Sequence, residues 1–193
     1  MKITVDRHIQ ARADKEVRWL STIGVLLQLD RQDPQVPDLW IDSPFAWIRL
    51  RPVRQKEEIG VRLVAGWSAM RNLDVVHSQD KQAELIVQNR RVKVSLALLE
   101  KSGSYKFQQI RNQDYEFVFC LGISPFDAHA WLISKSALAA HVIGHTPQHR
   151  GRAGTDTFWI SVDPQRAPEW LNACGGRLSS VLALMQKWKA AAR

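Results

Sequence analysis

The seven residues 117–123 form an uninterrupted apolar run, Phe-Val-Phe-Cys-Leu-Gly-Ile, whose length suits a β-strand. A strand without polar alternation is typical of a sheet interior that is covered on both faces. Candidates for the covering layers are residues 9–29, 55–72 and 178–189, where apolar side chains recur at helical spacing. The run therefore predicts an α/β fold in which helices flank a mixed sheet.

The chain between these helices contains further strand patterns. Residues 84–87 and 92–96 are short, β-branched segments that predict a hairpin. Residues 130–133 and 157–162 predict two more strands, whereas residues 105–111 are expected to form a short helix. The order of these elements is that of a mixed sheet with helices on its faces.

A break near the N-terminus predicts how the chain is divided. Pro34 and Pro37 lie in an aspartate-rich segment that cannot continue a helix. We therefore expect a helical extension with a Pro-rich loop over residues 1–42, and the α/β domain over residues 43–193.

The composition indicates the kind of partner. The 193 residues include 27 Lys and Arg against 19 Asp and Glu, a net charge of +8 that is suited to a polyanion. No apolar run approaches the ~18 residues of a membrane span. The first residues also lack the apolar stretch of a signal peptide. We therefore expect a cytoplasmic protein without a membrane partner.

Common catalytic and metal-binding signatures are missing from the sequence. It contains neither a Gly-rich phosphate loop nor a G-x-S-x-G turn, and its two cysteines lack the paired spacing of a zinc site. His141, His145 and His149 recur every four residues, but Gly144 and Pro147 interrupt any helix that would align them. Loop or surface histidines are the expected outcome.

Two regions could hold phosphates. Arg150 and Arg152 alternate with glycines, which fits either a phosphate clamp or a solvated loop. Residues 90–111 hold six basic residues against the single acid Glu100, which fits either a DNA contact or a solvated basic face. Hydroxyl and amide groups in the same segment suit phosphates and base edges. These groups belong to Tyr105, Gln108 and Gln109. The candidate nucleic-acid-binding residues are Arg90, Arg91, Lys101, Tyr105, Lys106, Gln109, Arg111, Arg150 and Arg152.

Several longer strings carry a resemblance to a known family. They are Tyr-Lys-Phe-Gln-Gln-Ile-Arg-Asn-Gln-Asp-Tyr at 105–115, Leu-Gly-Ile-Ser-Pro-Phe-Asp-Ala-His-Ala-Trp at 121–131 and Gly-Thr-Asp-Thr-Phe-Trp at 154–159. Together with Glu-Ile-Gly-Val-Arg-Leu-Val at 58–64, they resemble the PD-(D/E)XK, or restriction-endonuclease-like, superfamily. The resemblance implies a restriction-endonuclease-like mixed β-sheet flanked by helices, with the N-terminal helical extension outside it.

The resemblance also implies where chemistry would occur. In that superfamily one strand supplies an Asp and the next supplies Glu-x-Lys; the carboxylates hold Mg²⁺ and the lysine activates water. Here Glu84 stands at the Asp position, Lys93-Val94-Ser95 stands where Glu-x-Lys is expected, and Val61 replaces a glutamate of the first core helix. Glu84, Lys93 and Ser95 are thus degenerate catalytic positions, with Glu84 as the candidate metal ligand.

A cation at a ligand position disfavours Mg²⁺. We therefore predict a protein that binds double-stranded DNA without a cofactor and acts as a homodimer or within a larger phage-defence or DNA-processing assembly. Two alternatives stay open. One is an active Mg²⁺-dependent endonuclease whose ligands have moved, for example to Asp74 or Asp80. The other is a protein-interaction scaffold that binds no nucleic acid.

Overall fold

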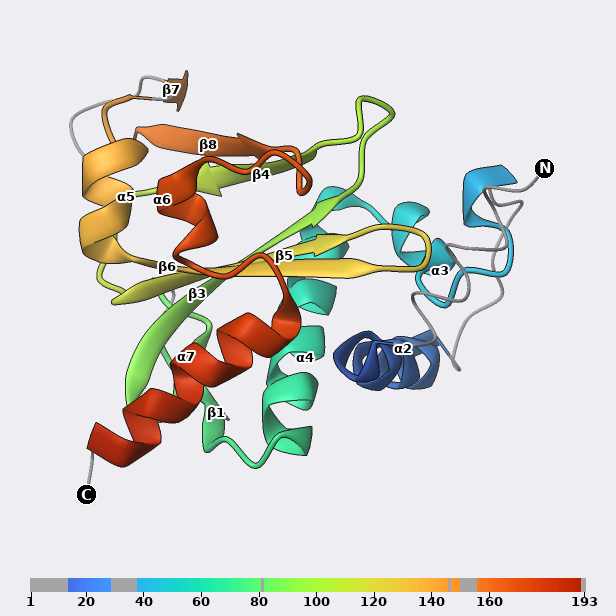
Figure 1. Cartoon of the computed structure of the whole chain (residues 1–193), viewed down its shortest axis with the longest axis horizontal. Coiled ribbons are helices and arrows are strands. Elements are labelled where there is room, and N and C mark those ends of the chain that lie inside the picture. Colours follow the sequence, from blue (N-terminus) through green and yellow to red (C-terminus); the bar gives the residue numbers. More distant parts are fainter. Residues whose placement is uncertain (1–13, 29–37, 81, 146, 150–155, 192–193) are drawn as a thin grey trace.

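The computed structural model of the chain describes residues 14–28, 38–80, 82–145, 147–149 and 156–191 (Figure 1). The helices are α2 (Lys15–Gln28), the 3-10 helix η1 (Asp38–Trp40), α3 (Ala46–Arg49), α4 (Val53–Met70), α5 (Lys135–His141), α6 (Glu169–Asn172) and α7 (Leu178–Ala191). The strands are β1 (Val75–His77), β2 (Leu85–Val87), β3 (Arg90–Leu98), β4 (Tyr105–Ile110), β5 (Phe117–Ile123), β6 (Ala128–Ser134), β7 (Pro147–His149) and β8 (Thr157–Val162).

These strands form two sheets. The larger has five strands in the order β1-β2-β3-β5-β6; β3 and β5 run parallel, and the other neighbouring pairs are antiparallel. The smaller sheet has the order β4-β8-β7 and is antiparallel. The predicted α/β fold, a mixed sheet flanked by helices, is confirmed.

The larger sheet separates two hydrophobic cores. Helices α2, α4 and α7 pack on one face, and the smaller sheet with α5 and α6 packs on the other (Figure 1). Alternation along β5 places Phe119 and Leu121 in the first core and Val118 and Cys120 in the second. The prediction that residues 117–123 form a strand covered on both faces is therefore confirmed.

Two glycines set the distances between these layers. A Cβ atom at Gly60 of α4 would lie 2.8 Å from the Cβ of Leu96, so glycine allows α4 to approach β3 closely. A Cβ atom at Gly122 of β5 would lie 2.8 Å from the ring of Tyr105 on β4. The absence of side chains at these positions brings α4 and β4 close to the β3–β5 pair, on opposite faces of the sheet.

The expectation of a short helix at residues 105–111 is wrong, because β4 occupies this segment. Tyr105, Phe107 and Ile110 are buried, at spacings of two and three. The spacing changes because β4 contains a bulge where it pairs with β8. A strand with a bulge therefore imitates the irregular spacing of one helical turn.

The other predicted elements agree with the structure to within a few residues. The helices expected at 55–72 and 178–189 are α4 and α7, and α2 covers the described part of the helix expected at 9–29. The predicted hairpin is β2–β3, but its turn comprises only Gln88 and Asn89, both with positive φ. The strands expected at 130–133 and 157–162 are β6 and β8.

The three regularly spaced histidines do not share a helix, as expected. Helix α5 ends at His141, whose ring stacks on Trp170 with 4.6 Å between ring centroids. His145 follows in a turn, and His149 belongs to β7. Among the described residues, no helix is both long and apolar enough to cross a bilayer.

Candidate functional site

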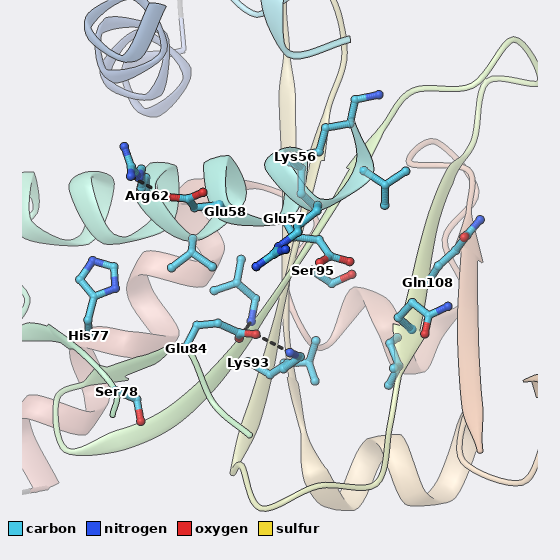
Figure 2. Close-up of a pocket in the computed structure, with 18 of the residues that line it drawn as sticks. Lys56, Glu57, Glu58, Arg62, His77, Ser78, Glu84, Lys93, Ser95 and Gln108 are labelled. Atoms are coloured by element: carbon cyan, nitrogen blue, oxygen red, sulfur yellow. Dashed lines mark hydrogen bonds and ion pairs between the residues drawn. The ribbon is translucent and has the colours of Figure 1, made fainter. Parts of the chain in front are cut away.

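An open cleft of about 890 Å³ lies between α4, the β2–β3 hairpin and β4 (Figure 2). The predicted catalytic positions Glu84, Lys93 and Ser95 all line it. Glu84 directly precedes β2, while Lys93 and Ser95 lie two apart on β3 and so share one face of the sheet. The other charged or amide side chains of the cleft are Arg54, Lys56, Glu57, Glu58, Arg62, Gln79, Asp80, Lys106, Gln108 and Gln109.

The carboxylate of Glu84 is already occupied by groups of the protein. The Lys93 ammonium donates to its Oε1 atom, and the Val94 backbone N–H donates to its Oε2 atom at 2.9 Å. The two side chains are only 27% and 24% exposed, so water screens their attraction incompletely. Lys93 therefore neutralises Glu84 at the position where the resemblance to PD-(D/E)XK nucleases would imply a metal ion.

The other carboxylates of the cleft do not complete a metal site. Glu58 pairs with Arg62, and Asp80 pairs with Arg91. Glu57 lines the cleft one helical turn before Val61 and makes no ion pair among the described residues. Over the described part of the chain, no three His, Cys, Asp or Glu side chains are grouped so that they could hold a metal. A metal ion at Glu58, Asp80 or Glu84 would have to displace the cation that already pairs with that carboxylate.

Most of the positive charge at the start of β3 is neutralised by acids from elsewhere. Arg90 pairs with Glu116 at 2.6 Å. Arg91 pairs with both Asp80 and Asp114. Two of these acids follow the 90–111 segment by only a few residues, so a slightly wider sequence window would have included them. In the folded protein, much of the excess positive charge of residues 90–111 is therefore paired with these acids.

The remaining residues predicted to contact DNA differ in whether they reach the cleft. Tyr105 is fully buried; its hydroxyl lies 3.0 Å from Nδ1 of His129, and burial raises its pKa above the ordinary range. Lys101 is exposed in the turn between β3 and β4, and Arg111 is exposed after β4; neither lines the cleft. Arg150 and Arg152 lie outside the described residues. Lys106, Gln108 and Gln109 do line it.

A second basic group lies at the start of α4. Arg54 and Lys56 line the cleft, and the first turn of the helix holds no acid that would offset them. Burial, and then the neighbouring charge of Arg49, lower the pKa of Lys56. The sequence shows these basic residues, but Glu57 and Glu58 follow them directly and hide their effect in a simple charge count.

Lys106 supplies the cation of the opposite wall. Its ammonium lies 4.1 Å from the ring centroid of Trp159 on β8, which restrains a side chain that is otherwise flexible. Three cations of the cleft make no ion pair among the described residues: Arg54, Lys56 and Lys106. Glu57 is the carboxylate of the cleft that is also without an ion pair there. The cleft therefore keeps cations on two walls after its internal pairs are accounted for.

These features define an α/β protein with an open, cation-bearing cleft beside a five-stranded mixed sheet. No protein-family model and no curated protein matches the chain. The solved structure of a bacterial homing endonuclease is similar to it, with a TM-score of 0.48 and 14% sequence identity. The match covers 72% of this chain and 96% of that one.

Proposed function

We propose that this protein binds double-stranded DNA in the cleft and does not cleave it. The observation that carries the proposal is the Lys93–Glu84 pair, which keeps the charge balance of a metal-bound carboxylate without a metal. Cations on α4 and β4 then face the phosphates from two sides. No Mg²⁺ is required for this binding. In the cell, the protein is a recognition subunit of a defence or DNA-processing assembly, either as a homodimer or with other chains.

The number of available cations gives the expected salt dependence. If Arg54, Lys56 and Lys106 each contact one phosphate, the logarithm of the affinity falls with the logarithm of the salt concentration with a slope of about −2.7. The affinity then decreases about 40-fold between about 50 and 200 mM salt. A larger slope would indicate that further basic residues, such as Lys101 and Arg111, also reach the backbone.

The test compares two triple alanine variants that lose the same charge. The first removes Arg54, Lys56 and Lys106 from the cleft, and the control removes Arg18, Arg166 and Lys187, which are exposed outside it. Fluorescence anisotropy with a labelled duplex is measured over a range of salt concentrations. We expect the first variant to lose most of its affinity and salt dependence, and the control to stay close to wild type. Equal losses would mean that net charge, not the cleft, holds the DNA.

A cleavage assay separates the open alternatives. Plasmid and linear DNA are incubated with the protein in Mg²⁺ or Mn²⁺, alongside Glu84→Ala and Glu57→Ala. We expect intact DNA in every sample. Metal-dependent cutting that either substitution abolishes would establish an endonuclease with moved ligands. A wild-type protein that neither binds nor cuts DNA would leave the interaction scaffold.

A further inference from the structure

The bulge in β4 places two successive glutamines on one face of the strand. Phe107 pairs with Ile160 and Ile110 pairs with Phe158, so two residues of β4 lie opposite the single residue Trp159 of β8. In a regular strand, neighbouring side chains point to opposite faces. Here Gln108 and Gln109 are both exposed and both line the cleft, while Ile110 returns to the core.

The backbone at this bulge adopts a conformation that side-chain-bearing residues rarely take. Gln109 has φ of 58°, in the left-handed region that glycine adopts without strain. The side chain of Gln148 on β7 stabilises this arrangement. Its Oε1 atom accepts the backbone N–H of Gln109 at 2.9 Å, and its Nε2 atom donates to Oε1 of Gln108 at 3.3 Å. A glutamine where glycine would be easier suggests that the side chain itself has a use.

The amide of Gln109 is available for such a use. It makes no hydrogen bond among the described residues, and it carries one acceptor and two donor hydrogens. This combination matches the major-groove edge of adenine, which offers N7 as acceptor and the N6 amino group as donor. Gln108 uses its oxygen toward Gln148 and keeps its amino group for a neighbouring acceptor. Gln109 therefore suits a base edge better than a phosphate, which only accepts, whereas the amino group of Gln108 suits either.

We infer that Gln109 reads the adenine of an A·T base pair in DNA held by the cleft, with Gln148 as a positioning residue. The inference rests on the proposed DNA binding and adds sequence preference to it. A bidentate contact of this kind changes the affinity by roughly 5- to 150-fold between the preferred base and the wrong one. The preference depends on the side chain, whereas the general affinity depends on the cations of the cleft.

The experiment selects bound molecules from a pool of random-sequence duplexes. We expect the enriched sequences to share an A·T pair at one position. Changing that pair to G·C should lower the affinity by roughly 5- to 150-fold. Gln109→Gly keeps the backbone conformation and removes the amide; it should bring the ratio of the affinities for the A·T and G·C duplexes close to one. Gln148→Ala should reduce the ratio of the affinities for the A·T and G·C duplexes. Gln165→Ala, an exposed glutamine outside the cleft, is the matched control and should change nothing.

The outcomes separate this inference from the proposed function. Salt-dependent binding without a preferred base at any position would overturn the inference and leave the DNA-binding proposal standing. A preference that survives in Gln109→Gly would also overturn it. A wild-type protein that binds no duplex in the pool would overturn both.

Discussion

Glu84→Gln is expected to weaken the fold and to strengthen DNA binding at the same time. Lys93 and Glu84 form an ion pair in which the two side chains are 24% and 27% exposed. Two opposite charges at ~4 Å attract by ~1 kcal/mol in bulk water and ~4 kcal/mol near a protein surface. The lost hydration of both groups offsets part of that attraction. The free energy of unfolding should therefore fall by about 1 kcal/mol.

The effect on DNA binding has the opposite sign. The neutral amide leaves the Lys93 ammonium without its counter-charge at the floor of the cleft. One additional phosphate contact makes the salt slope steeper by about 0.9, which corresponds to about eightfold tighter binding at about 0.1 M salt. Lys93→Met should weaken DNA binding, because it leaves the Glu84 carboxylate facing the phosphates. The double variant should bind nearly as wild type does.

Chemical denaturation and anisotropy titrations on these four proteins measure both effects. If Glu84→Gln binds duplex DNA no more tightly than the wild type, Glu84 does not hold Lys93 back from the phosphates. Nor is Lys93 the partner that matters if Mg²⁺ raises the melting temperature of the wild type and Glu84→Gln abolishes that rise. The second result would identify Glu84 as a metal ligand despite its pairing with Lys93.

Three further predictions concern the surroundings of the cleft. Arg54→Glu places an acid in the first turn of α4, so it should stabilise the protein by about 0.3–1 kcal/mol in denaturant titrations while weakening DNA binding. Gly122→Ala should destabilise it by about 1–3 kcal/mol, seen as a lower melting temperature, because the new Cβ would overlap the Tyr105 ring. Burial, foremost, lowers the pKa of His129 below its usual value of 6.5, so the folded state binds fewer protons than the unfolded state. Stability should thus fall as the pH drops below about 6.5, and His129→Asn should flatten that dependence in pH-dependent unfolding.

The long periodic elements of this fold could be predicted because burial on one face repeats regularly along them. Helix α4 follows from the helical spacing of its apolar residues, whereas β5 follows from its continuous apolar run, which is buried on both faces. Strand β4 could not, because its bulge changes the spacing of buried residues from two to three. Only pairing with β8, which lies far along the sequence, identifies it as a strand.

Part of the candidate site could likewise be predicted from local sequence, and part of it could not. Glu84, Lys93 and Ser95 reach one cleft because the hairpin alternation that predicts their common face is local. The charge available in and around the cleft could be predicted only in part, because a sequence window shows which acids are near but not which cations they pair with. Folding brings Asp80, Asp114 and Glu116 to Arg90 and Arg91 and leaves Lys106 without an ion-pair partner among the described residues.

The position of β5 between two cores affects how the cleft responds to unfolding. One wall of the cleft, α4, belongs to the first core, and another, β4, belongs to the second. Because β5 contributes side chains to both cores, we expect the two cores to unfold together, in one cooperative transition. A ligand that spans the cleft would hold both halves together. Its binding energy would then appear as resistance to unfolding of the whole chain, including α7, which does not line the cleft.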